Sequence, residues 1–511
     1  MIAKIISICL CIALFACLGV TALAENDVDS KARISLPYDE SKYVVRLDYE
    51  GLDMAGLDVA NARFGSTTAG DADVGGGCSI TFAEYRDGTV GAVRNMDLQL
   101  SSYCSYELFI RPGENVKYPV WGLAYTGFDQ KTFKQLLETG VSDEYYPVIP
   151  FTTTDSMSFG KNDKGEDASL YCAILMRSEQ YDEDGNYTWT CTGTNPGAPI
   201  RCCTQSVTTL IASQCISIDD ALKYVGAVDE KYERIFPDDE PTLDVYTFNI
   251  ETETMSNHWF EVCAMEDSTG RHGVLEFIED RAIWHEGVDY SFNFFLQDEY
   301  RVNEDGTYRE QYGAGLGRYE ATVPYLDRIH TVADHVALMD GIRYSFVTYY
   351  NEDAGYVGHD WLGNPVDWRS EFTHVDVFSA YNKFKNILGF DTTEPDERYP
   401  LWANYRNTET GKIEKVDSLD YYLKNRDHLS CIWDLNYVMD DANKDEIETY
   451  LRWAGLLNCS LTIKQVADMN SGWETYFRVV ADPMHCSVTR WFNEDITTAD
   501  TVTLKTWEAI G

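Results

Sequence analysis

Alternation of apolar and polar residues marks the strands of this chain, and the first clear pair begins just after Cys78. The runs "SITFAEY" (79–85) and "TVGAVRNMD" (89–97) suit half-buried strands, and Asp87-Gly88 between them is a typical hairpin turn. These residues are therefore predicted to form a β-hairpin. Further strands are predicted within residues 257–284, around a turn at Asp267–Gly270, and within residues 475–493.

Helical periodicity replaces this alternation in four other stretches. "DQKTFKQLLETG" (129–140) is predicted to be a helix that Asp129 caps and Gly140 ends. Two more helices are predicted in "QSVTTLIASQC" and "SIDDALKYVG", the second capped by Ser217. The fourth is predicted within residues 323–342. Strands and helices thus alternate in blocks without strict βαβ units, which indicates an α+β fold of antiparallel sheets covered by helices.

The composition of the chain changes along its length and suggests its organisation. Residues 25–77 are predicted to be a leader, because they are acidic and end in "STTAGDADVGGG", where little can be buried. Residues 78–511 are predicted to be the main domain. Within it, residues from about 351 to 470 are aromatic and loop-rich, and they are predicted to be an insertion between core elements.

The first 24 residues are typical of a secretory signal. Lys4 precedes the apolar run "IISICLCIALFACLGV", and "TALA" ends before Glu25 as a small-residue cleavage site. The stretch "LFAC" ending at Cys17 leaves a second interpretation open, a lipoprotein anchored there. No later stretch approaches the roughly 18 apolar residues of a membrane span. The protein is therefore expected to be secreted or attached to the cell envelope, with no membrane-spanning segment.

Composition narrows the classes of partner. A hydrophobic content of 44% with 13% aromatic residues argues against disorder. The formal net charge of −43 argues against nucleic acid as a partner, since phosphate binding needs Lys and Arg, and it suits solubility in a salty extracellular medium. EF-hand spacing and C-x-x-C pairs are absent from the sequence, so no metal site is predicted.

The cysteines leave two interpretations open. Eleven of the fourteen cysteines follow residue 24, and an odd number in an oxidising compartment leaves one thiol over. If Cys78 is that thiol, the other ten could form five disulfides. The alternative is that several are buried, reduced thiols.

Cys78 has the surroundings of a nucleophile at a new N-terminus. A terminal cysteine carries an α-amine with an ordinary pKa of about 7.7–8.0, which can accept the proton of its own thiol. That amine forms only if the chain is cut between Gly77 and Cys78. The triplet Gly75-Gly76-Gly77 suits this step, because it has no side chains to hinder attack on the Gly77 carbonyl. The alternative is a disulfide cysteine after a flexible linker.

Two charged residues on the second strand of the hairpin support the first interpretation. Arg94 and Asp97 follow Cys78 by 16 and 19 residues, and the turn brings their strand back beside Cys78. We expect Arg94 to hold the thiolate or the substrate carbonyl, and Asp97 to hold the amine.

This pattern resembles the choloylglycine hydrolases, which include bile salt hydrolases and penicillin V acylases, within the N-terminal-nucleophile (Ntn) hydrolases. The family's opening motif is a Cys, a turn Gly and Arg-Asn-x-Asp, which here are Cys78, Gly88 and "RNMD" (94–97). The resemblance continues to the end of the chain, apart from the insertion. It is carried by the stretches "LIASQCISIDDALKYV", "HWFEVCAMEDSTGRHGVLEF", "SFNFF", "GRYEA" and "YFRVVADPMHCSVTRWFN".

The resemblance also implies roles for three later residues. "SFNFF" matches the segment with the family's oxyanion-hole asparagine, which falls on Asn293, and "GRYEA" places Arg318 near the site. "TTDSMSFGKN" matches the segment with a second oxyanion-side asparagine, but Ser158 stands there. Ala321 also replaces a second arginine of the family. The serine puts bile salt specificity in particular doubt.

The resemblance implies a four-layer αββα sandwich of two antiparallel sheets covered by helices. It implies a self-processed cysteine hydrolase of linear amides that forms an acyl-thioester, needs no cofactor and acts on a small molecule as a monomer or homo-oligomer. Bile salts, penicillin V and N-acyl amides all offer a suitable bond. Two alternatives stay open. One is an N-terminal-cysteine dipeptidase or acyltransferase of the same superfamily, and the other is a secreted binding protein without catalysis.

Overall fold

The computed structural model divides by its contacts into two units, residues 1–31 and 32–511, and every residue described below belongs to the second. The ranges that the structure describes are residues 44–64, 76–98, 104–126, 130–138, 146–176, 190–250, 254–255, 260–297, 300, 319, 322–341, 345–346, 350–351, 356–357, 371–372, 403–407, 413–416, 429–431, 474–492 and 495–510.

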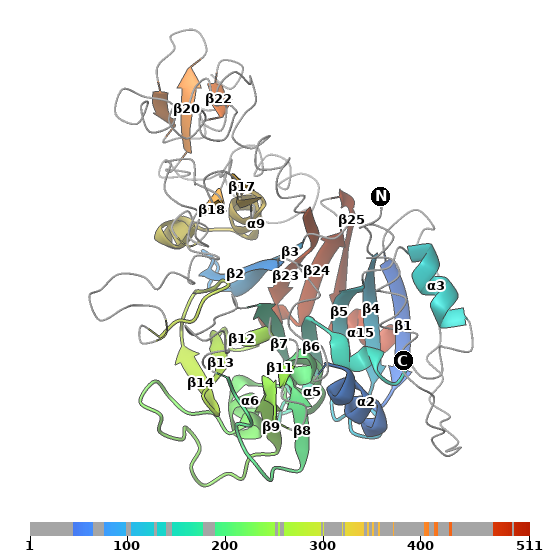
Figure 1. Ribbon diagram of the computed structural model, residues 1–511. Coiled ribbons are helices and arrows are strands. Elements are labelled where there is room, and N and C mark those ends of the chain that lie inside the picture. The colour runs from blue at the N-terminus through green and yellow to red at the C-terminus, as the bar shows by residue number, and fades with distance from the viewer. Residues whose placement is uncertain are drawn as a thin grey trace. The chain divides into compact units, whose positions relative to one another are not determined.

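An eight-stranded sheet runs in the order β1-β4-β5-β6-β7-β12-β13-β14 (Figure 1). The pair β1 and β4 is parallel, and every other neighbouring pair is antiparallel. Its strands are β1 (Val44–Glu50), β4 (Cys104–Arg111), β5 (Val120–Thr126), β6 (Asp155–Lys161), β7 (Asp167–Met176), β12 (Phe260–Asp267), β13 (His272–Ile278) and β14 (Arg281–Glu286).

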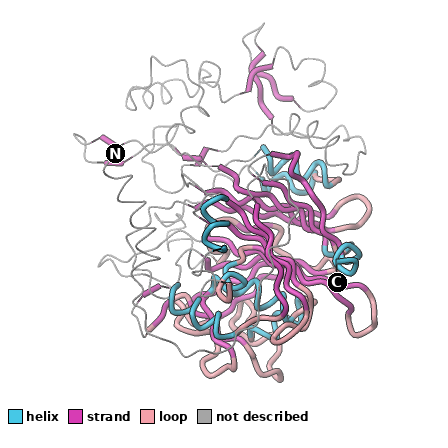
Figure 2. The backbone as a smooth tube through the Cα atoms, turned by 90° about the vertical axis from the view of Figure 1, so that its right-hand side faces the viewer, coloured by secondary structure: helices cyan, strands magenta, loops and turns pink. Residues whose placement is uncertain are grey.

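A six-stranded antiparallel sheet runs in the order β15-β2-β3-β23-β24-β25. In Figure 2 the strands of the two sheets form the centre of the described chain. The strands of the six-stranded sheet are β2 (Gly76–Glu84), β3 (Val90–Leu98), β15 (Tyr290–Ser291), β23 (Glu474–Asp482), β24 (Ser487–Phe492) and β25 (Asp495–Thr503).

Helices and short strands complete the described elements. The α-helices are α2 (Met54–Phe64), α3 (Gln130–Glu138), α5 (Val207–Gln214), α6 (Ile218–Val225), α9 (Val332–Gly341) and α15 (Leu504–Ile510). The 3₁₀ turns are η1 (Ile149–Thr152), η2 (Thr204–Ser206), η3 (Val323–Arg328) and η5 (Pro483–His485). The short strands are β8 (Ile200–Cys203), β9 (Leu243–Tyr246), β10 (Phe248–Asn249), β11 (Thr254–Met255), β16 (Ser345–Phe346), β17 (Tyr350–Asn351), β18 (Tyr356–Val357), β19 (Glu371–Phe372), β20 (Ala403–Asn407), β21 (Ile413–Val416) and β22 (Leu429–Cys431).

The inner faces of the two sheets share one hydrophobic core, and helices cover their outer faces. The inward residues Ile80 and Phe82 of β2 belong to this core together with Leu123 of the other sheet. Helix α5 lies on the eight-stranded sheet, where the Thr208 hydroxyl donates to the Thr153 carbonyl at 2.8 Å. Helix α9 lies on the six-stranded sheet and forms a second apolar cluster with β3. The α+β class with two large sheets is thus confirmed.

Several predicted elements are confirmed. Strands β2 and β3 form the hairpin, and Gly88 takes a positive φ of 84° in its turn. Helix α6 begins after Ser217, whose hydroxyl accepts a hydrogen bond from the Asp220 N–H, and ends at Gly226 in the left-handed conformation. The stretch predicted as one helix at 323–342 is instead divided into η3 and α9, with extended backbone at Ile329. Periodicity alone does not separate a 3₁₀ turn from an α-helix, so the break was missed.

The sequence pattern gave no strand between residues 104 and 176, where the structure has four. Strand β5 shows why: its first five residues, Val120–Ala124, are all buried and include no polar side chain, so no apolar–polar alternation marks it. The pattern also assigned no element to residues 25–77, where β1 and α2 lie. Of the predicted insertion at 351–470, only short strands are described, and its boundaries stay a prediction.

The cysteines of the described ranges favour the interpretation that several of them are buried, reduced thiols. Six of them are buried free thiols: Cys172, Cys202, Cys203, Cys215, Cys263 and Cys486. Five disulfides among ten cysteines would leave none of these six as a thiol. The five-disulfide interpretation is therefore wrong for this structure, because these sulfurs are packed into apolar interiors as small hydrophobic groups.

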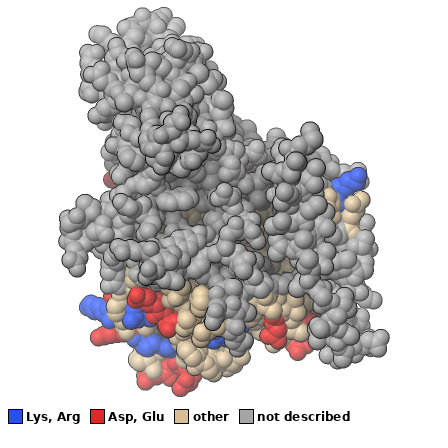
Figure 3. Space-filling view, in the orientation of Figure 1, with Lys and Arg blue, Asp and Glu red and all other residues tan. Residues whose placement is uncertain are grey.

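Exposed charges of both signs lie on the surface of the described residues. Figure 3 shows acidic and basic side chains of the described residues next to one another on the lower part of this face. Arg271, for example, is paired with Asp219 and Glu286. Among the helices that the structure describes, none has both the length and the apolar character that a bilayer crossing needs.

His335 on α9 is a buried titratable group at the boundary with the six-stranded sheet. Its ring nitrogens lie 2.7 Å from the Thr81 hydroxyl and 3.0 Å from the Tyr85 hydroxyl. Burial lowers the pKa of His335 to about 3. The imidazole is therefore neutral in the folded protein at neutral pH and well below it.

We predict that His335 makes folding stability depend on pH. The unfolded chain binds a proton at this histidine below about pH 6.5, whereas the folded chain does not bind it until about pH 3. Neutral His335 therefore makes its full contribution to the free energy of unfolding above about pH 6.5. This contribution is lost on acidification toward about pH 3, by up to about 1.4 kcal/mol per pH unit. Urea unfolding of the wild type and His335→Gln between about pH 4 and 7 should give curves that converge toward low pH. Parallel curves would contradict the assignment.

Candidate active site

Cys78 lies on β2 between the two sheets, and its side chain is fully buried. Its register partner on β3 is Met96, whose sulfur lies 3.3 Å from the Cys78 sulfur. The guanidinium of Arg94 lies on the same face of β3, because side chains two residues apart on a strand point to one side. Arg94 Nη2 is 3.9 Å from the Cys78 sulfur. A cation at this distance favours the thiolate form.

Arg94 joins the two sheets through its other contacts. Its Nη1 atom lies 3.1 Å from Asp155 Oδ2 on β6, and its Nη2 atom donates to the Ile174 carbonyl on β7 at 3.1 Å. The guanidinium also lies over the Phe477 ring, 5.2 Å from its centroid. These contacts fix the guanidinium in place before any substrate arrives.

Asp155 supplies the counter-charge for Arg94, and both side chains are fully buried. The Asp155 carboxylate accepts hydrogen bonds from the Tyr171 hydroxyl at 2.5 Å and the Thr154 hydroxyl at 2.9 Å. Burial raises the pKa of Asp155, while Arg94 and these two hydroxyls oppose that rise. Burial alone would lower the pKa of Arg94, but Asp155, Cys78, Tyr171 and Asp97 together outweigh it, so the pKa of Arg94 is raised and the cation persists.

Asn293 contacts the backbone nitrogen of Cys78. This asparagine follows β15 and is buried, and its Oδ1 atom accepts a hydrogen bond from the Cys78 N–H at 3.1 Å. In the uncut chain the donor is a peptide group. After cleavage before Cys78, the same nitrogen would be the α-amine. Asn293 is therefore placed to orient the Cys78 nitrogen. The sequence predicted only an oxyanion-binding role for Asn293 and not this contact.

Asp97 lies beside the peptide bond that would be cut. Its register partner on β2 is Gly77, the residue before Cys78. Its Oδ1 atom accepts a hydrogen bond from the Thr475 hydroxyl on β23 at 2.6 Å. Asp97 alternates with Met96 along β3 and therefore lies on the other face of the strand. The structure thus brings Asp97 next to Gly77 but does not place it on the face that carries the thiol.

Of the other two predicted residues, the structure describes only Ser158. Ser158 lies on β6, where its hydroxyl contacts the N–H and carbonyl of Leu170 at 3.1 and 3.4 Å, within the eight-stranded sheet. Its role in oxyanion binding stays a prediction. Arg318 lies outside the described residues.

Sequence reasoning missed two members of the site. Asp155 stands within "TTDSMSFGKN", three residues before Ser158. The available signal was an acid inside a buried strand, because a buried acid is nearly always paired. Thr475 gives no such signal, because its contact with Asp97 joins residues far apart in the chain. Within the ranges that the structure describes, no group of three His, Cys, Asp or Glu side chains is placed to hold a metal ion.

Comparisons with known proteins give weak similarity at the level of structure. No family model matches the sequence, and no curated protein matches it. A mutant of the conjugated bile acid hydrolase from Clostridium perfringens has a TM-score of 0.30 and 10% identity over 84% of this chain and 92% of its own. A second variant of that protein has a TM-score of 0.29, 11% identity and coverage of 84% and 93%.

Penicillin V acylase from Agrobacterium tumefaciens has a TM-score of 0.28 and 10% identity, over 81% of this chain and 83% of its own. TM-scores of this size do not establish a shared fold.

We predict that breaking the buried ion pair destabilises the fold. Replacing Asp155 by Ala leaves the Arg94 cation buried without its counter-charge, which should lower the free energy of unfolding by about 3–5 kcal/mol. The matched control is Asp167→Asn, which removes an acid from the solvent-exposed ion pair with Lys161 and should change stability far less. Urea unfolding of both variants measures the difference. Equal effects would show that the Arg94–Asp155 pair has no special role.

Proposed function

We propose that this protein is a self-processed cysteine hydrolase that cleaves carbon–nitrogen bonds in linear amides, of the choloylglycine hydrolase type with an Ntn-hydrolase fold. The observation that carries this proposal is the arrangement at Cys78. Its sulfur lies 3.9 Å from a fixed guanidinium, and its backbone nitrogen is held by Asn293 at 3.1 Å. One residue thus offers a nucleophile next to a cation, and a nitrogen that cleavage would turn into its base.

Maturation would begin with attack of the Cys78 sulfur on the Gly77 carbonyl carbon. The bond from that carbon to the Cys78 nitrogen breaks, a thioester forms, and the released amine takes the thiol proton. Water then hydrolyses the thioester, which leaves a carboxylate on Gly77 and restores the thiol beside a free α-amine. Gly76 and Gly77 favour this step because neither has a side chain beside the carbonyl.

Turnover would repeat the same chemistry on a substrate. The α-amine accepts the thiol proton, the sulfur attacks the acyl carbonyl, and the proton passes to the leaving amine as the carbon–nitrogen bond breaks. Water then releases the acid from the thioester. Arg94 favours the thiolate, and Asn293 orients the amine, with its side-chain NH₂ as the proposed donor to the oxyanion. Bile salts, penicillin V and N-acyl amides are the proposed substrate types, and secretion through residues 1–24 is part of the proposal.

We predict that maturation and turnover both require the Cys78 sulfur. The wild type should begin at Cys78, whereas Cys78→Ala should keep the residues before it and lose amide turnover by at least about a thousandfold. Intact-mass analysis and a panel of acyl amides measure the two effects. Cys172→Ala, which removes another buried thiol, is the control and should be processed and active. An active Cys78→Ala variant would refute the mechanism.

Two replacements of Asn293 should separate its two roles. Asn293→Asp keeps an oxygen that can accept from the Cys78 nitrogen but loses the NH₂ donor, and Asn293→Leu loses both. If the donor stabilises the oxyanion, kcat of the Asp variant should fall by about 10²–10³-fold. If Asn293 only orients the amine, the Asp variant should stay close to wild type and only the Leu variant should fail. Steady-state kinetics on the processed proteins distinguishes these outcomes, and full activity of both variants would exclude Asn293 from the site.

A further inference from the structure

Residues 44–64 precede the proposed cleavage point, yet they are built into the fold as β1 and α2 (Figure 1). We propose that this N-terminal segment, residues 44–64, stays bound to residues 78–511 after cleavage. The active protein would then be two chains held together without a covalent link. The proposal rests on the self-cleavage proposed above, and the contacts of the segment carry it.

Strand β1 completes the eight-stranded sheet. It pairs in parallel with β4 over seven residue pairs, from Val44 opposite Ser105 to Glu50 opposite Arg111. Val45 and Leu47 are only 2% and 0% exposed. Loss of the segment would expose to water the apolar core residues that Val45 and Leu47 now cover. It would also leave the edge of β4 unpaired, and such an edge is a site for aggregation. A strand in this position is part of the core, unlike a leader that merely covers it.

A buried carboxylate in the main domain also depends on the segment. Glu107 of β4 is fully buried, and its Oε1 atom accepts from Trp121 Nε1 and Arg490 Nε. Its other oxygen, Oε2, is bound by Arg46 Nε of β1 at 2.7 Å. Burial raises the pKa of Glu107, but Arg490 and Arg46 more than offset this and lower it. Departure of β1 would remove one of the two cations that hold this charge inside.

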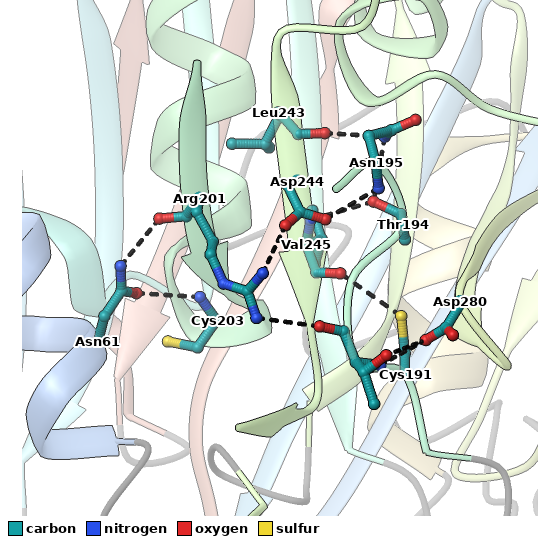
Figure 4. A network of polar contacts seen from close by, with 11 residues as sticks. Asn61, Cys191, Thr194, Asn195, Arg201, Cys203, Leu243, Asp244, Val245 and Asp280 are labelled. Atoms are coloured by element: carbon teal, nitrogen blue, oxygen red, sulfur yellow. Dashed lines mark hydrogen bonds and ion pairs between the residues drawn. The ribbon is translucent and has the colours of Figure 1, made fainter. Parts of the chain in front are cut away.

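Helix α2 forms a second anchor through Asn61, as Figure 4 shows. The Asn61 Nδ2 atom donates to the Arg201 carbonyl at 2.8 Å, and its Oδ1 atom accepts from the Cys203 N–H at 3.0 Å. One side-chain amide thus satisfies both a donor and an acceptor of strand β8. On the same helix, Leu57 and Ala60 are 2% and 0% exposed in the shared core.

The backbone between β1 and α2 is bound as well. The Gly51 N–H donates to the Arg111 carbonyl at 3.1 Å, and the Leu52 N–H donates to the Glu114 carbonyl at 2.8 Å. The Asn115 side chain returns a hydrogen bond to the Leu52 carbonyl at 2.9 Å. The segment is therefore held by a sheet edge, a buried charge, a side-chain amide and its connecting loop. Cutting at Gly77 breaks none of these contacts.

The first experiment separates retention of the segment from self-cleavage. A recognition sequence for a site-specific protease is inserted after Ala69 in the full-length Cys78→Ala chain, which cannot cut itself. After proteolysis, gel filtration is run in native buffer and in urea. We expect both fragments to elute together in native buffer and apart in urea. Separate elution in native buffer would overturn the proposal.

Point variants of the cut protein test the contacts themselves. Asn61→Ala and Leu57→Ala should speed dissociation of the segment by about tenfold or more, because one unpairs β8 and the other leaves a cavity. Asp58→Ala is the matched control, since Asp58 is exposed on the same helix, and its dissociation rate should equal that of the parent. If all three rates were the same, α2 would not be an anchor and the proposal would fail.

The wild type links the two proposals. After maturation, residues 44–64 should co-purify with the chain that begins at Cys78 and separate from it only on denaturation. A wild type that stays uncut at Gly77 would defeat the self-cleavage, while the inserted protease site would still decide whether the segment is retained.

Discussion

The candidate site depends on one positive charge that is buried between two sheets. Arg94 extends from the six-stranded sheet and meets Asp155 of the eight-stranded sheet at 3.1 Å, and neither side chain is exposed. Burial of such a pair has a large desolvation cost, so its net stabilisation is small, but loss of one partner is severe. The pair joins the two sheets at one defined point. Because Cys78 contacts the same guanidinium, that geometry also sets the surroundings of the sulfur.

A second ion pair repeats this arrangement elsewhere between the sheets. Arg490 of β24 meets Glu107 of β4, and both are fully buried. Here the carboxylate has two cations, because Arg46 of β1 binds its other oxygen. The inner faces are mainly apolar, so each of these charges must find its partner across the interface. The two ion pairs allow few alternative alignments of one sheet on the other. The second pair also involves Arg46, which precedes the proposed cleavage point.

The parts that could be predicted from sequence are those that depend on local pattern. The hairpin of β2 and β3 brings Cys78 and Arg94 together by a turn and a fixed spacing, and both are visible in the sequence. The capping of α6 by Ser217 is equally local. Strands buried on both faces, such as β5, lack the alternation that would mark them. Strand β1 was missed because its parallel partner lies more than fifty residues further on.

The same distinction holds within the site. Cys78 and Arg94 followed from spacing, and Asn293 followed only from the resemblance to a family. Asp155 and Thr475 contact residues that lie far away in the chain, and the only local signal was that Asp155 is an acid inside a buried strand. Ser158 was chosen by position in a motif, whereas its contacts lie within its own sheet. Residues that complete a buried charge can be found from sequence only when the burial of their neighbours is known.

The uncut strand gives a physical reason for cleavage next to Cys78. Strand β2 continues through Gly77, so Asp97 faces a neutral peptide across the pair. Cleavage would replace that peptide by an amine that is partly cationic near neutral pH, beside a carboxylate that Thr475 already holds at 2.6 Å. Asn293 would keep its contact with the same nitrogen. Under the proposed cleavage, a charged amine would donate a stronger hydrogen bond to Asn293 than the peptide N–H does, and this contact would favour the cut state over its reversal.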